Sequence, residues 1–237
     1  MELTHTEEIY LFDAARRSFR DMADQDYLSA RLCYKNKLTF QFLWMAQQAV
    51  EKYIKAILLF NKIPVTNLRH DLKKGLQKIN QISYLDFELS DKTIKFIDYL
   101  NEQGPNRYFQ NTMYTQGYEI ITLDRAVWEL RLYCKLLNYK IKTNDDKNLN
   151  LLEVELKRIE SAKNKPAHLY SITGGYLEKR LKDNKFKQGD ILTWKNFYFG
   201  KKRKKTIKIG MSMGIAHPTH HMHPEALETL SKFFKIY

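Results

Sequence analysis

The residues best suited to acid–base chemistry are histidines with charged neighbours, and His70 is the first of these. It lies between Arg69 and Asp71. An imidazole beside a carboxylate can accept and return a proton during a reaction. The alternative is structural, because an aspartate that opens a helix accepts hydrogen bonds from free backbone amides. We favour the structural role for this cluster and keep His70 as a catalytic candidate.

A second group of histidines lies near the C-terminus. Neutral imidazoles at such density can bind zinc. However, no cysteine accompanies them, and Glu225 is the one acidic residue close by. A surface loop that leads into a helix is the simpler interpretation, so we predict no metal and no cofactor here. The group consists of His217, His220, His221 and His223.

Five consecutive cations are the strongest binding signal in the sequence. They repel one another and gain nothing from burial, so a polyanion such as RNA or DNA would stabilise them. Contacts of lysine with a phosphate backbone tolerate many base sequences. Aromatic residues at 194–199 precede the run and could stack on bases, although side chains of this type more often pack inward. The run consists of Lys201, Lys202, Arg203, Lys204 and Lys205.

The distribution of charge points to the same part of the chain. The formal net charge is +13 over 237 residues. Residues 1–142 carry 21 lysines and arginines against 17 aspartates and glutamates, whereas residues 143–237 carry 19 against 10. A basic excess of this kind attracts nucleic acid. A lysine-rich surface that serves solubility is an equally good explanation from composition alone.

Composition and segment lengths exclude other classes of protein. No run of 18 apolar residues occurs, so we expect no membrane span. Nothing near the N-terminus resembles a signal peptide, and we expect a cytoplasmic protein. The two cysteines, Cys33 and Cys134, lie in helical patterns and are expected to be reduced core residues.

Apolar spacing of three and four residues predicts a helical bundle over residues 1–142. The clearest helix is 39–60, where a continuous apolar stripe contains no Gly or Pro. We expect no convincing strand in this part, and short connections favour an antiparallel arrangement. The other predicted helices are 6–38 with a break near 24–26, about 70–79, 90–103 and 122–141.

A polar stretch at 142–148 marks the predicted boundary to a second domain, 143–237. We expect helices at 149–162 and 176–181, and a closing helix that starts at Pro224. Residues 191–199 and 206–213 read as two strands of a β-hairpin with the basic run at its tip. The predicted fold class is therefore mainly α, an antiparallel helical bundle followed by a small α+β part.

The run from Phe42 to Leu59 resembles the signature helix of HEPN domains, through its Gln-Gln-Ala-Val-Glu-Lys pattern. The resemblance extends to Asp26 and Ala30 before that helix, and to the His-Asp-Leu that starts at His70. It also includes Asn106, Arg107 and Tyr108, and it covers about 24–142. It implies a helical bundle that pairs as a homodimer, binds or cuts RNA, and often belongs to a toxin–antitoxin or phage-defence system.

The sequence departs from the HEPN pattern at the ribonuclease motif. The family's ribonucleases carry an arginine and a histidine four to six residues apart on the last helix, and neither Arg125 nor Arg131 is followed by a histidine in this way. Arg107 could contact a phosphate, although a buried arginine that staples the turn to a carboxylate is as good an interpretation. A histidine of the C-terminal group could supply the missing base by docking near Arg107 or Arg131. The catalytic candidates are therefore His70, Arg107, Arg131, His220 and His221, none of them assigned firmly.

Three hypotheses follow from these observations. The first is a HEPN homodimer that binds RNA without cutting it. The second is a divergent, metal-independent ribonuclease that uses a non-standard histidine. The third is a protein-interaction module, such as an antitoxin or scaffold, whose cations meet an acidic partner or a cognate toxin or antitoxin.

Overall fold

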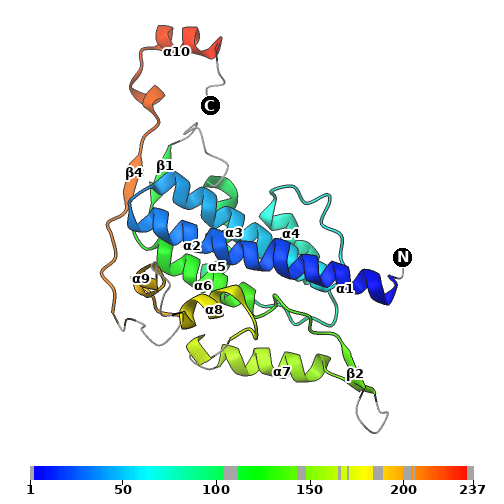
Figure 1. Cartoon of the computed structure of the whole chain (residues 1–237). Helices are drawn as coiled ribbons and strands as arrows, with labels where there is room; N and C mark the ends of the chain where they lie inside the picture. Colours follow the sequence, from blue (N-terminus) through cyan, green and yellow to red (C-terminus); the bar gives the residue numbers. More distant parts are fainter. Residues whose placement is uncertain are drawn as a thin grey trace.

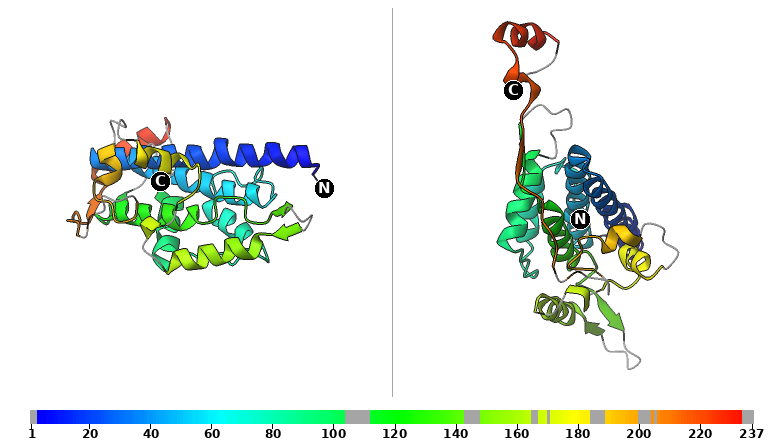
Figure 2. Two further views of the ribbon diagram at one scale, coloured as in Figure 1. Left: turned by 60° about the horizontal axis from the view of Figure 1, so that its bottom comes forward. Right: turned by 90° about the vertical axis from the view of Figure 1, so that its left-hand side faces the viewer.

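The computed structural model describes residues 3–103, 112–142, 148–164, 167–169, 171–183, 189–199, 204 and 206–233. Helices dominate this part of the chain, and Figure 1 shows them gathered around a central α3. The mainly α fold class is therefore confirmed. An elongated segment near the C-terminus extends away from this body (Figures 1 and 2).

The first helical layer is one continuous rod. α1 (His5–Ala14) begins at a capping box in which Thr4 and Glu7 satisfy each other's backbone amides. It passes through a π-helical turn, η1 (Ala15–Arg20), into α2 (Asp21–Lys35). The expected break at 24–26 is wrong. Asp24 is fully buried and its carboxylate has partners inside the protein, so it does not end a helix there.

Three helices around the core agree with their predicted positions. α3 (Thr39–Phe60) supplies the largest share of the buried residues. α4 (Leu72–Asn80) starts where the Asp71 side chain accepts a hydrogen bond from the Lys74 amide at 3.0 Å, so the predicted capping role is confirmed. α5 (Asp91–Gln103) follows Ser90, whose hydroxyl accepts from the Thr93 amide.

α6 (Glu119–Arg131) ends ten residues before the expected end of its helix. The chain then turns, and Tyr133, Cys134 and Leu137 are buried outside any helix. Two strands lie in the part where none was expected, β1 (Met113–Thr115) and β2 (Lys140–Lys142). β2 pairs antiparallel with β3 (Asn148–Asn150), on either side of the predicted boundary. Both cysteines are free, and Cys134 is buried.

The hairpin expected at 191–199 and 206–213 is not formed. Residues of its first strand belong to α9 (Gly189–Thr193), because the buried Arg31 guanidinium donates to the carbonyl oxygens of Ile191 and Trp194 and holds this turn against α2. The second segment is extended, and its end forms β4 (Met213–Ile215). β4 pairs antiparallel with β1, so its partner comes from the bundle and not from a neighbouring strand.

The remaining elements match the expected order. α7 (Leu152–Lys163), η2 (Ala167–Leu169) and α8 (Tyr176–Lys182) follow β3. After β4 come η3 (Pro218–His221) and α10 (Pro224–Ser231), which starts at a proline as predicted. Residues of α7, α8 and α9 join the core of the bundle: Ile159, Ala162, Leu177 and Leu192. The domain boundary at 142 stays a prediction. No helix in the described ranges is long and apolar enough to cross a membrane.

We call residues 206–233 the arm. It leaves the body beside α5 and α6, passes through β4, and carries α10 to the far end of the molecule (Figures 1 and 2). The contact at its base is close: the Gly210 amide donates to the Gly117 carbonyl at 2.9 Å.

Candidate nucleic-acid interface

A groove of about 470 Å³ lies between α5 and α6 at the base of the arm. α5 contributes Lys92, Lys95 and Tyr99, spaced by three and four residues and therefore on one face. Tyr118, Ile121 and Arg125 have the same spacing at α6. We call this surface the basic groove; its lining is completed by Phe96, Gln116, Thr122 and Ile209.

The basic groove combines cations with aromatic rings. None of its described lining residues is an aspartate or glutamate, whereas Lys92, Lys95 and Arg125 are cationic. Tyr118 is 39% exposed, so its ring is accessible. The Tyr99 hydroxyl donates to the Tyr114 carbonyl at 3.0 Å, and burial raises the pKa of Tyr99, so this ring is held neutral. Cations beside an exposed ring suit a polymer with phosphates and flat bases.

Further cations lie at the base of the arm and just before it. Lys204 and Lys208 are exposed, and Ile209 of the same segment lines the groove. The Lys204 amide donates to the Asn196 carbonyl at 2.8 Å, which holds Lys204 beside the body. The other four cations of the run, Lys201, Lys202, Arg203 and Lys205, lie outside the described residues.

The aromatic residues before the basic run pack inward, which is the arrangement that the sequence analysis favoured. Phe199 is buried beside Tyr27, with 5.8 Å between ring centroids. Tyr198 lies 6.0 Å from Trp128, and the Trp194 ring lies 6.2 Å from Tyr34. These rings therefore attach the segment to the bundle and do not offer a stacking platform.

His70 is an exposed imidazole with a buried carboxylate behind it. Its Nδ1 lies 2.9 Å from Glu51 Oε2; the His70 side chain is 62% exposed and that of Glu51 is 9% exposed. Lys55 donates to the other Glu51 oxygen at 2.6 Å and forms an ion pair with it. A carboxylate on Nδ1 fixes the ring orientation and directs Nε2 away from it. This arrangement suits a general acid or base.

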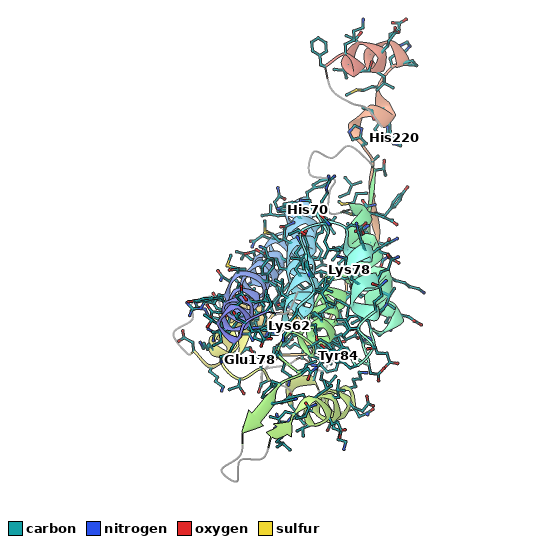
Figure 3. The ribbon with its side chains drawn as sticks, turned by 90° about the vertical axis from the view of Figure 1, so that its right-hand side faces the viewer. Lys62, His70, Lys78, Tyr84, Glu178 and His220 are labelled. Carbon is teal, nitrogen blue, oxygen red and sulfur yellow. The ribbon has the colours of Figure 1, made fainter. Side chains whose placement is uncertain are left out.

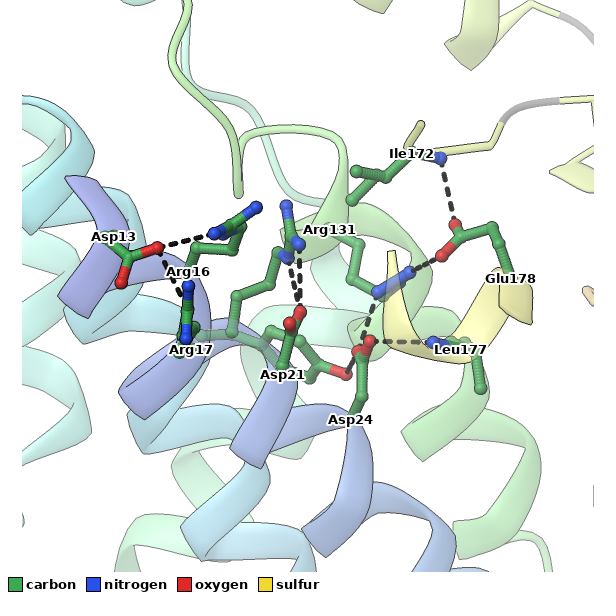
Figure 4. Close-up of polar contacts among 11 residues, drawn as sticks. Asp13, Arg16, Arg17, Asp21, Asp24, Arg131, Ile172, Leu177 and Glu178 are labelled. Atoms are coloured by element: carbon green, nitrogen blue, oxygen red, sulfur yellow. Dashed lines mark hydrogen bonds and ion pairs between the residues drawn. The ribbon is translucent and has the colours of Figure 1, made fainter. Parts of the chain in front are cut away.

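Arg131 belongs to a buried network and not to a surface site (Figure 4). It is 2% exposed, and its guanidinium donates to Asp24 at 2.7 Å and to Glu178 at 2.6 Å. Tyr53 donates to the same Asp24 carboxylate at 2.5 Å. Burial raises the pKa of Asp24, and the Arg131 charge acts in the opposite direction. The buried position gives Arg131 no access to a phosphate, and its partners described here include no histidine.

The C-terminal histidines lie on the arm, where Figure 3 shows His220 beyond the body that carries His70. His220 Nε2 lies 3.0 Å from the Thr112 hydroxyl, and the His217 amide donates to the same oxygen at 3.2 Å. His221 and His223 are exposed. Arg107 lies outside the described residues, which resume at Thr112. In the described ranges, no three His, Cys, Asp or Glu side chains form a group that could hold a metal ion.

Sequence reasoning missed the basic groove, although a signal was present. Lys92, Lys95 and Tyr99 form one helical stripe, and Tyr118, Ile121 and Arg125 form another. Each stripe alone resembles an ordinary solvated face. The pairing becomes visible only when α5 and α6 are known to lie side by side.

Comparison with known proteins gives one result. The model of the HEPN domain family matches residues 17–120, from η1 to the start of α6. This match confirms the resemblance of the Gln-Gln-Ala-Val-Glu-Lys helix and the His-Asp-Leu that follows it. No curated protein and no solved structure gives a significant match to the chain.

Proposed function

We propose that the protein binds RNA in the basic groove without cutting it, a function that the match of residues 17–120 to the HEPN domain family supports. The observation that carries the proposal is the pairing of Lys92, Lys95 and Arg125 with the exposed Tyr118 ring, in a groove whose described lining contains no aspartate or glutamate. The cations would contact phosphates, and a ring such as Tyr118 would stack on a base. Binding of this kind tolerates many sequences.

A matched pair of variants tests this proposal. The groove variant is Lys92→Gln with Lys95→Gln and Arg125→Gln; the control removes the same charge from exposed lysines outside the groove, Lys157, Lys179 and Lys182. Filter binding of single-stranded RNA at several salt concentrations gives the affinity and its salt slope. Each lost phosphate contact reduces the slope by about 0.7, so we expect a reduction of about 2 in the groove variant. An equal loss in the control, or affinity that does not fall with salt, contradicts the proposal.

The geometry of His70 supports a second candidate function, a divergent, metal-independent ribonuclease. An exposed imidazole oriented by Glu51 at 2.9 Å could accept a 2′-hydroxyl proton. Cleavage of a mixed RNA pool in the presence of a chelator tests this idea. His70→Ala should abolish the activity, while a double His220→Ala and His221→Ala variant asks whether the arm histidines contribute. If both variants cleave like the native chain, these histidines have no catalytic role.

We also propose the wider setting that the HEPN resemblance implies: a cytoplasmic homodimer in a toxin–antitoxin or phage-defence system, with a cognate toxin or antitoxin as partner. The competing role as a protein-interaction module predicts an acidic protein bound to the same cations. Co-purification from the native host distinguishes RNA binding from protein binding, because nuclease treatment releases bound RNA and leaves a protein partner bound.

A further inference from the structure

α10 buries none of its residues, and its two leucines, Leu227 and Leu230, are only half-buried. It has eight residues, and it lies at the end of the arm, away from the body (Figures 1 and 2). An isolated helix of this length is not stable in water, because too few hydrogen bonds offset the cost of starting it. α10 therefore requires a surface supplied by something else.

The faces of α10 show what that surface must offer. Leu227 and Leu230 share one face, and Phe233 follows 81% exposed. Glu225 and Glu228 are exposed, and the helix contains no lysine or arginine, in a chain with a net charge of +13. The complementary surface is an apolar groove with a cationic rim.

The basic groove has these properties. It lies between α5 and α6, and a groove between two helices can accept the apolar face of a third helix. Phe96 and Ile121 supply apolar contacts, and Lys92 and Lys95 are three residues apart on α5, as Glu225 and Glu228 are on α10. Both pairs are therefore about 4.5 Å apart along their helix axes, so each glutamate can face one lysine.

The direction of β4 favours the groove of another copy over that of the same chain. β1 leads toward α6, and β4 pairs antiparallel with it, so the arm runs away from its own groove after Ile209. We propose that α10 of one copy docks in the basic groove of a second copy, and that the second copy returns the contact. The exchange is a two-fold symmetric dimer contact. It also regulates the site, because α10 and RNA compete for the same surface; this part rests on the proposed function.

Charge exchange between copies tests the docking. The arm variant is Glu225→Lys with Glu228→Lys, and the groove variant is Lys92→Glu with Lys95→Glu. Each alone places like charges at both contacts, so we expect the dimer dissociation constant to rise at least about tenfold. An equimolar mixture of the two places opposite charges at both contacts and restores the dimer, as does the chain with all four changes.

Sedimentation over a dilution series measures these constants, and circular dichroism checks that the exposed changes leave the helices intact. A native chain that is monomeric at all concentrations overturns the proposal. An arm variant that remains dimeric also overturns the proposal. A third contrary result is a mixture that remains monomeric while the chain with all four changes recovers docking of α10 within one chain, because that pattern means that α10 folds back onto its own groove.

The regulatory part has a separate readout. Leu227→Ala with Leu230→Ala removes the apolar contacts of α10 without changing charge, and Thr229→Ala in the same helix is the control. If α10 covers the groove in about nine of ten molecules, the leucine variant binds RNA about tenfold more tightly at concentrations where the native chain is dimeric. Unchanged RNA affinity in a dimer-deficient variant overturns the competition. If no variant binds RNA, the proposed function fails while the sedimentation result still decides the docking.

Discussion

The two segments that follow the bundle are attached to it in opposite ways. Residues 148–199 are held by buried charges: Glu178 pairs with Arg131, the Leu177 amide donates to Asp24, and Arg31 binds the backbone of α9. The arm is held by a three-residue strand pair and by exposed hydrogen bonds such as that of His220 with Thr112.

This difference separates a structural role from a functional one, and net charge does not explain it, because residues 206–233 carry two lysines and two glutamates. A buried ion pair fixes geometry, because removing either partner leaves an uncompensated charge in the core. A short strand pair on the surface opens at low cost, as segments that bind partners generally do. The arm and the basic groove are therefore the better candidates for recognition, and the Arg131 network is a support.

Among the substitutions that test this difference in attachment, we expect Arg131→Met to have the largest effect. It leaves the Asp24 carboxylate buried without its cation, and we expect the free energy of unfolding to fall by about 3–5 kcal/mol in urea titrations. Arg16→Met is the control, since its pair with Asp13 is exposed, and it should change stability by less than about 1 kcal/mol. Adding Asp24→Leu to Arg131→Met should recover part of the loss. Similar losses in the Arg131 and Arg16 variants would falsify the assignment of Arg131 to a structural network.

A weaker test uses the pH dependence of the α8 attachment. Desolvation alone would raise the pKa of Glu178, but the Arg131 charge and the Ile172 amide outweigh it and lower that pKa below the ordinary 4.5. A lowered pKa in the folded state stabilises the protein above 4.5, and the contribution is lost as the pH falls. We expect Glu178→Gln to cost about 2 kcal/mol at neutral pH and progressively less below 4.5. The check is urea unfolding of both chains across this range. A stability difference independent of pH contradicts the ion pair.

The sequence alone was sufficient to predict those elements whose signals lie within a single helix. The apolar stripe of α3, the Asp71 cap of α4 and the proline that starts α10 are each contained within one helix. The continuity of α2 was not predictable in this way. Asp24 looked like a helix break because its partner, Arg131, lies 107 residues away.

The predictions of the hairpin and of the binding site failed for the same reason: both depend on contacts between segments that are distant in the sequence. The alternation of Ile207, Ile209, Met211 and Met213 does indicate an extended segment, but β4 pairs with β1 and not with the segment before it. For the site, the local signal of the cation run at 201–205 was visible. The basic groove was not, because it exists only where α5 and α6 lie side by side.

The smallest test compares two glycines with left-handed backbone. Gly117 has φ +79° at the base of the arm and Gly174 has φ +72° before α8, so alanine at either position costs about 1–2 kcal/mol through backbone strain. A methyl group at Gly174 has open space, whereas one at Gly117 overlaps the Gly210 carbonyl and pushes the arm away.

We therefore expect both alanine variants to lose similar stability in urea. Only Gly117→Ala should increase hydrogen exchange at the Gly210 amide and at the β4 amides, because the body does not depend on the arm for its packing. Protection of the α3 amides is the internal control. If Gly117→Ala also exposes α3 or α8 to exchange well beyond Gly174→Ala, the arm is part of the structural core, and the contrast between its loose attachment and the buried attachment of residues 148–199 does not hold.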